Sequence, residues 1–107
     1  MFQVSDADLK SYEEDGACVL RGVIDQSWQE KLAAAIERDI ASPGPFYHGY
    51  DSEDGKGRFH GNLRIWQNDS CFHEFCHKSV LPGLAQQFFA SQRINLLYDQ
   101  LFVKEPG

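Results

Sequence analysis

Several features that define common protein classes are scarce in this sequence of 107 residues. No run of about 18 consecutive apolar residues occurs, so the sequence predicts no membrane span and no membrane partner. The net charge is −6 and no basic cluster is visible, which argues against a nucleic-acid partner. The 3 cysteines form no paired framework, and the first residues lack the basic and apolar regions of a secretory signal. We therefore expect reduced thiols and a cytoplasmic protein.

The residues that are present indicate a single globular domain. Hydrophobic residues make up 42% and charged residues 24% of the chain, which is ordinary for such a domain. The chain is long enough for one domain and no more. Aromatic residues make up 13%, which is on the high side. They predict either a substantial core or an apolar surface that further polypeptide covers.

Capping residues and apolar spacing predict four helices. Ser5 begins the first, which runs to about Glu14, and Asp25 begins the second. Asp69 or Ser70 begins a third that ends near His77, and Ser79 begins a fourth that ends near residue 90. The second helix carries an apolar residue at every fourth position with Ala35 beside them, which predicts one buried stripe: Trp28, Leu32, Ile36 and Ile40.

Extended segments are predicted at three places. Ala17–Leu20 is a short apolar strand, and Leu63–Trp66 is a short strand or extended segment. Residues 98–104 form the last strand, which the turn Glu105–Gly107 ends because proline cannot donate to a ladder. Residues 46–62 contain four glycines among polar residues and are predicted to be a long, mobile loop, with a possible role as a lid.

The last strand alternates in a way that separates two faces. Gln100, Phe102 and Lys104 share one face, while Leu101 and Val103 share the other. The first face either meets water or lines a polar cavity, and Lys104 on an exposed edge strand would block pairing with other chains. A sheet has to supply partners for this strand, and none can follow it in these residues, so we expect this chain to be the front portion of a larger protein.

The run Cys71-Phe-His73-Glu-Phe-Cys76-His77 invites a zinc-site hypothesis. On a helix, the two histidines lie at i and i+4 and can face one ion. The two cysteines are five positions apart, which separates them around the helix. The alternative is that Phe72, Phe75 and Cys76 pack inward and the histidines lie on the surface, and the ligand spacing favours this alternative.

Three other candidates have ordinary structural explanations. Cys18 has no neighbouring base, so packing in the core is favoured over a role as nucleophile. The glycines around Lys56 do not match the spacing of a phosphate-binding loop. Basic side chains near this loop can contact an anionic substrate, although solvated charge is favoured: Arg58, His60 and Arg64. Trp66 can line a ligand pocket or anchor a loop, and both interpretations stay open.

The chain resembles the phytanoyl-CoA dioxygenase family of non-haem iron, 2-oxoglutarate-dependent oxygenases. The run Tyr98–Gly107 looks like the strand that enters the catalytic barrel of that family. The opening helix residues and the following run Cys18–Ile24 resemble the start of the family: Leu9, Tyr12, Glu13, Asp15 and Gly16. The helix at Trp28–Ile40 follows at the expected place. The iron-binding motif of the family, His-x-Asp with a distant second His, does not occur in these residues.

The resemblance implies an α+β fold class, with residues 1–107 forming the N-terminal part of a single oxygenase domain. The chain would supply flanking helices and the first strands of a double-stranded β-helix, or jelly roll. The whole protein would use Fe(II) and 2-oxoglutarate to hydroxylate a small organic or acyl substrate, and this chain alone would be inactive, with neither cofactor bound. No catalytic or metal residue is assigned. The resemblance assigns cofactor contacts to Gln100 and Lys104. It assigns substrate contacts to Arg64, Trp66 and Phe102.

Two alternatives remain open at this stage. One is a small non-enzymatic α+β interaction domain, and the other is a zinc-stabilised version of it built on the Cys71–His77 run. A strand with an unpaired edge also predicts self-association of the chain through that edge.

Overall fold

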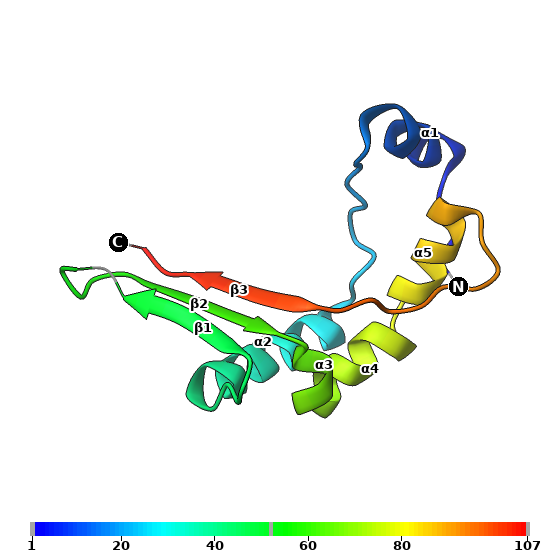
Figure 1. Ribbon diagram of the computed structural model, residues 1–107. Helices are drawn as coiled ribbons and strands as arrows, with labels where there is room; N and C mark the ends of the chain where they lie inside the picture. Colours follow the sequence, from blue (N-terminus) through cyan, green and yellow to red (C-terminus); the bar gives the residue numbers. More distant parts are fainter. Residues whose placement is uncertain (1, 52, 107) are drawn as a thin grey trace.

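The computed structural model describes residues 2–51 and 53–106 and has a mixed α+β architecture, as predicted. Met1, Ser52 and Gly107, the last residue of the predicted terminal turn, lie outside the described residues. The elements are α1 (Asp6–Asp15), α2 (Gln26–Ala41), β1 (Tyr47–Asp51), β2 (Arg58–Leu63), α3 (Ile65–Asn68), α4 (Ser70–Lys78), α5 (Leu81–Phe89) and β3 (Gln100–Lys104). The strands form an antiparallel sheet in the order β1-β2-β3. The sheet extends to one side of the molecule, and α1 and α5 lie at the other end (Figure 1).

Three of the four predicted helix starts are confirmed by capping hydrogen bonds, whereas α5, expected to begin at Ser79, begins after Val80 without a side-chain cap. Ser5 accepts one in the first turn of α1, and Asp25 accepts one from the backbone N–H of Trp28 at 2.8 Å. Asp69 begins α4 in the same way. Gly16 ends α1 with φ of 77°, a left-handed conformation that glycine adopts without a side-chain penalty. The helix boundaries are therefore fixed by local chemistry.

The predicted strand at Ala17–Leu20 is wrong. These residues have no regular structure and belong to the extended connection from α1 to α2 (Figure 1). Val19 is 71% exposed, so the apolar run is not matched by burial. A strand requires a partner for its backbone groups, and none of the described strands pairs with this segment.

The predicted long loop at residues 46–62 is also wrong, because β1 and β2 form a hairpin there. Its register pairs Tyr47 with Asn62 and Asp51 with Arg58. The buried positions of β2 carry polar residues, so the usual apolar alternation of a strand is missing from the sequence. The signal that was available is Asp54-Gly55 at the turn, since Asp-Gly between two alternating segments is typical of a hairpin.

Of the predicted extended segment Leu63–Trp66, only Leu63 is in a strand, as the last residue of β2. Arg64 has φ of 56°, which turns the chain out of β2, and the short helix α3 begins at Ile65. The left-handed conformation is uncommon for a residue with a side chain. It lets Ile65 enter the core directly after the sheet.

The core lies where three helices meet the sheet. Ala35 of α2, Ile65 of α3 and Phe72 of α4 form a buried cluster, and Leu101 of β3 packs against it. The inward face of α2 is centred on Ala35 and Asp39, which are both buried. The four residues of the predicted stripe flank this centre and are half-buried, so the stripe lies on the correct side of the helix but not at its middle.

An ion pair joins α2 to α4 at the edge of this core. Two guanidinium nitrogens of Arg38 donate to the two carboxylate oxygens of Asp69 at 3.0 and 3.2 Å. The hydrogen bonds from Arg38 hold the pKa of Asp69 below its usual value. The same carboxylate caps α4, so one side chain fixes both the start of that helix and its position on α2.

The molecule exposes more surface than a compact protein of its mass. The accessible area is 7828 Å² for 12.2 kDa, about 1,700 Å² above the area typical of folded monomers. The radius of gyration is 16.2 Å, against about 13 Å for a compact domain of this length. Much of the excess is apolar, including Leu97, Tyr50 and Phe102. Within residues 2–51 and 53–106, no helix is long and apolar enough to cross a membrane.

Truncation of the core aromatic on α4 tests the packing. Phe72 is 5% exposed, so we expect Phe72→Ala to lower the free energy of unfolding by about 3–5 kcal/mol. Phe89, at 63% exposed on α5, is the matched control, and Phe89→Ala should change it by less than about 1 kcal/mol. Urea unfolding of both variants makes the comparison. Equal losses would contradict the assignment of the core.

Candidate ligand-binding face of the sheet

The two faces of the sheet carry different chemistry. Because side chains alternate along each strand, the register places eight positions on one side, here called the open face: His48, Tyr50, Phe59, Gly61, Leu63, Gln100, Phe102 and Lys104. The other side meets α2 and the core. The alternation predicted for the last strand is confirmed, since Leu101 packs on the core while Gln100, Phe102 and Lys104 are exposed.

Aromatic rings on the open face contact one another across all three strands. The ring of Phe59 lies 5.5 Å from Tyr50 on β1 and 5.6 Å from Phe102 on β3, between centroids. His48 lies 6.5 Å from both Phe59 and Phe102. These distances are typical of interacting aromatic pairs. Three of the four rings were missed from the sequence because they lie in the segment predicted to be a loop.

A buried polar network occupies the opposite face. Asp39 of α2 accepts hydrogen bonds from Nε2 of His60 at 2.7 Å and from Nδ2 of Asn62 at 2.9 Å. Nδ2 of Asn62 also donates to the carbonyl of Pro43, while its Oδ1 is buried without a hydrogen-bond partner. All three side chains of the network are buried. The network ties β2 to α2, and His60 is not the solvated charge that was favoured from the sequence.

The predicted substrate residues fall in two places. Arg64 is exposed, lies over the ring of Phe46 at 5.4 Å, and shares a hollow of about 450 Å³ with Gln100. Trp66 instead lies against His73 and His77 of α4, at 5.9 and 5.8 Å between ring centroids. Arg64 is therefore close to Gln100, one of the two predicted cofactor residues, whereas the contacts of Trp66 are with α4.

The cysteines of the hypothetical zinc site have separate partners. Sγ of Cys71 donates to the carbonyl of Lys31, and Sγ of Cys76 lies 3.6 Å from the carboxylate of Asp99. The imidazoles of His73 and His77 are exposed and stack on each other. Among the described residues, no three His, Cys, Asp or Glu side chains come together to hold a metal. The surface placement predicted for the two histidines is confirmed.

The other candidates have local contacts. Lys56 lies at the hairpin turn, where its backbone N–H donates to Asp54, and Arg58 forms an ion pair with Glu105 at 2.8 Å. Cys18 is half-buried beside a hollow that Tyr12, Leu20 and Phe88 also line. The strand expected around Cys18 is absent, although partial burial of the thiol agrees with a packing role.

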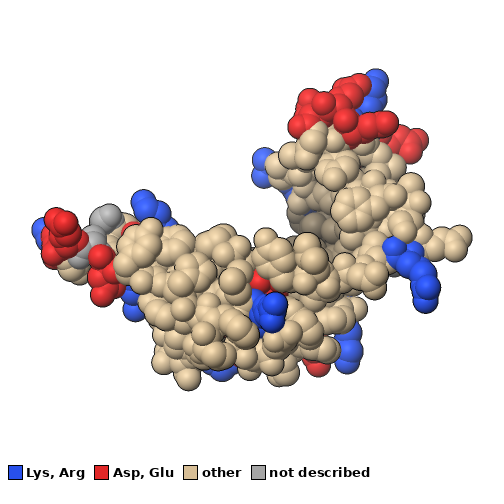
Figure 2. All heavy atoms as spheres, viewed as in Figure 1, with Lys and Arg blue, Asp and Glu red and all other residues tan. Residues whose placement is uncertain are grey.

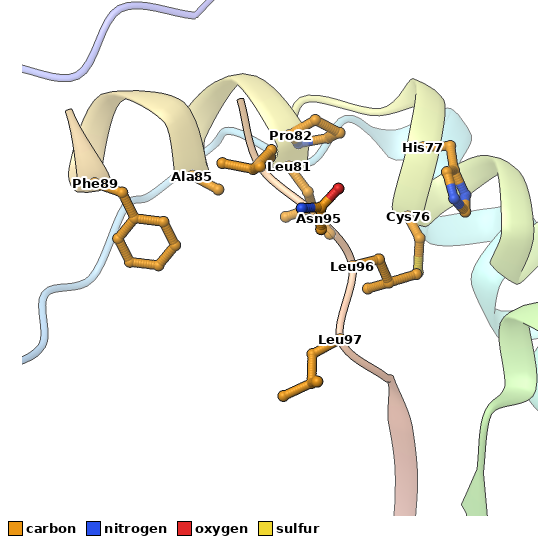
Figure 3. A pocket seen from close by; sticks show the side chains of 10 residues that line it. Cys76, His77, Leu81, Pro82, Ala85, Phe89, Asn95, Leu96 and Leu97 are labelled. Carbon is orange, nitrogen blue, oxygen red and sulfur yellow. The ribbon is translucent and has the colours of Figure 1, made fainter. Parts of the chain in front are cut away.

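A further hollow, of about 320 Å³, lies between α4, α5 and residues 94–97. Figure 3 shows Cys76 and His77 at one end of it and Phe89 at the other. The remaining lining is mostly aliphatic, and the lining includes no Asp, Glu, Lys or Arg. Such a hollow has little to orient a polar ligand.

The polar network offers a direct test of how the sheet is held. Asp39→Ala leaves two buried donors without their acceptor, so we expect it to lower the free energy of unfolding by about 3–5 kcal/mol. Glu37→Ala, at an exposed position of the same helix, should change it by less than about 0.5 kcal/mol. Chemical denaturation of both variants makes the comparison. A small loss for Asp39→Ala would mean that the network does not hold β2 on α2.

The thiol of Cys76 predicts a loss of stability in alkali. Burial first, and then the negative charge of Asp99, raise its pKa to about 11. The folded state therefore holds the thiol proton more tightly than the unfolded state does, so this contribution is present below about pH 9 and is lost as the pH rises toward 11. Unfolding of the protein and of Cys76→Ser across this range measures it. An identical alkaline decline in both would refute the role of the thiol.

Comparison with known proteins gives no relative for this geometry: no protein-family model, no curated protein and no solved structure matches the chain. The resemblance to the phytanoyl-CoA dioxygenase family thus stays a prediction. A function is therefore inferred from the arrangement of the open face and the buried network.

Proposed function

We propose that this chain is the N-terminal part of a phytanoyl-CoA dioxygenase-like, Fe(II)- and 2-oxoglutarate-dependent oxygenase. The observation that carries the proposal is the two-sided sheet. One face is covered by α2, and the other presents Gln100, Phe102 and Lys104 together with aromatic rings and is left uncovered by the described residues. A wall with helices outside and ligand-binding side chains inside is what a jelly-roll oxygenase requires of its first strands.

The excess surface supports an incomplete domain. An area of about 1,700 Å² beyond that of a compact monomer is about twice the roughly 800 Å² that each partner buries in a standard protein interface. The remaining strands of a barrel would cover such an area. The outer edges of β1 and β3 have no partner strand in the described sheet. The remaining barrel strands would pair with these edges, and without those strands the exposed edges favour self-association of the chain.

In this proposal the chain supplies binding groups and no iron ligand. The described residues bring no three metal-ligating side chains together, so no step of the iron chemistry is assigned to them. Lys104 and Gln100 would hold a carboxylate of 2-oxoglutarate, the first by charge and the second by hydrogen bonding. Phe102 and Arg64 would contact a small organic or acyl substrate. Trp66 would influence substrate binding indirectly, by positioning α4, because its ring lies on the two histidines of that helix.

The proposed setting is the cytoplasm, with a small molecule as the substrate and neither nucleic acid nor membrane as a partner. The net charge of −6 is compatible with the absence of a nucleic-acid partner, because polyanionic partners would be repelled.

Succinate formation tests the proposal. We expect none from these 107 residues with Fe(II), ascorbate and 2-oxoglutarate, and iron-dependent formation from a protein that joins them to the polypeptide following residue 107 in the gene. In that protein, Lys104→Ala should raise KM for 2-oxoglutarate by about tenfold or more. Lys10→Ala, on the exposed face of α1, is the matched control.

Two outcomes would overturn the proposal. One is a following sequence without His-x-Asp and a distant second His. The other is an unchanged KM for both co-substrates in Lys104→Ala. The first outcome would favour the alternative, a non-enzymatic α+β interaction domain, which the same uncovered aromatic face also suits. A zinc-stabilised form of that domain is disfavoured, because the Cys71 and Cys76 thiols contact different groups.

A further inference from the structure

The open face is organised as two rows that run across the strands. Tyr50, Phe59 and Lys104 are directly opposite one another in the first row. His48, Gly61 and Phe102 form the second. Opposed residues lie about 4.5–5.5 Å apart in antiparallel sheets. Lys104 therefore stands at the end of a row that also holds the rings of Tyr50 and Phe59.

Glycine at position 61 leaves room for the imidazole of His48 in the second row, where the His48 and Phe102 rings meet edge to face at 81°. A Cβ built there would lie 2.6 Å from Nε2 of His48, which is closer than real atoms approach. The imidazole thus lies across the sheet where a side chain of β2 would otherwise stand. In the first row, the Tyr50 and Phe59 rings are inclined by only 21° to each other. These four rings form an aromatic surface, here called the platform, whose flattest part is the Tyr50–Phe59 pair and in which the Phe102 ring is inclined by 39° to Phe59.

The charge of the platform is opposite to that of the chain. The protein carries a net charge of −6, yet none of the strand residues on the open face is acidic and Lys104 is its only fixed cation. Asp51 and Arg58 fall on the other face, where Arg58 pairs with Glu105. In Figure 2, acidic side chains gather over α1 and at the hairpin tip, and the surface between these two regions is mostly uncharged.

The platform is accessible in the described chain. Tyr50 is 71% and Phe102 is 56% exposed, and His48 and Lys104 are exposed as well. A second copy of this chain is a poor occupant, because its own open face would bring another lysine and no carboxylate. A ligand with a flat apolar body and one anionic group matches both the rings and the cation.

We propose that the open face binds a flat aromatic carboxylate, with its ring on the platform and its carboxylate on Lys104. The ring stacks on Phe59 and Phe102, where offset or tilted contacts are available to it. The inference uses residues of this chain alone and does not rest on the oxygenase proposal.

Two-dimensional NMR of the 107-residue chain at neutral pH tests the inference with three matched probes. 2-Naphthoate has both features, decahydro-2-naphthoate keeps the carboxylate on a body that is not flat, and 2-naphthalenemethanol keeps the ring without charge. We expect 2-naphthoate to bind most tightly and to shift resonances of the open-face residues. Decahydro-2-naphthoate should bind about 2- to 12-fold more weakly, the range expected for losing one aromatic contact. 2-Naphthalenemethanol should bind about 1.4- to 5-fold more weakly, the range expected for losing one exposed ion pair.

Variants locate the site. Phe102→Leu should weaken binding of 2-naphthoate by about 2- to 12-fold and Lys104→Gln by about 1.4- to 5-fold. Lys104→Gln should also abolish the preference for 2-naphthoate over the neutral alcohol. Phe89→Leu and Lys10→Gln change an exposed aromatic and an exposed cation elsewhere and should leave binding unchanged. Unperturbed spectra of the free variants show that each one is folded.

Four results would overturn the inference. They are the absence of binding, equal binding of the flat and the saturated carboxylate, shifts confined to the hollow between α4 and α5, and concentration-dependent broadening of open-face resonances without any probe. The last result would identify a second copy of the chain as the occupant. Binding by the platform together with a failed succinate assay would leave the inference standing and reject the oxygenase.

Discussion

The pair of hydrogen bonds to the carboxylate of Asp39 is the interaction on which the rest of the structure depends. The carboxylate lies on the inward side of α2 and accepts hydrogen bonds from His60 and Asn62, and all three side chains are buried. Both donors point to the same side of β2, so a shift of one residue in the register would turn them away and leave the carboxylate unpaired. The network therefore fixes the position of the helix and the register of the sheet together.

This arrangement inverts the usual distribution of side chains in a sheet. Polar residues of β2 face the helix, and the rings of Tyr50, Phe59 and Phe102 face outward, where Tyr50 and Phe102 are exposed. Solvated aromatic surface is unfavourable at about 25 cal/mol per Å², so the open face gains free energy when something covers it. The rest of an oxygenase barrel and a flat anionic ligand would each do so, and Lys104 has a role in both.

The sequence was informative where local chemistry decides the structure. Capping residues such as Ser5 and Asp25 predicted helix starts, and the alternation around Phe102 predicted the two faces of β3. The hairpin was missed because His60 and Asn62 are buried for the sake of Asp39, a partner 21 and 23 positions away that no local pattern reveals. The run at Ala17–Leu20 failed in the opposite sense, since it is apolar but none of the described strands pairs with it.

His48 and His60 provide the most direct measurement of the two-sided sheet. They lie on neighbouring strands, one on the open face and the other in the Asp39 network. Hydroxyl-radical footprinting of the folded chain should label His48 and Phe102 readily and leave His60, which is 2% exposed, protected. Similar labelling of the two histidines, or protection of Phe102 together with His48, would contradict the assignment of the faces and everything inferred from it.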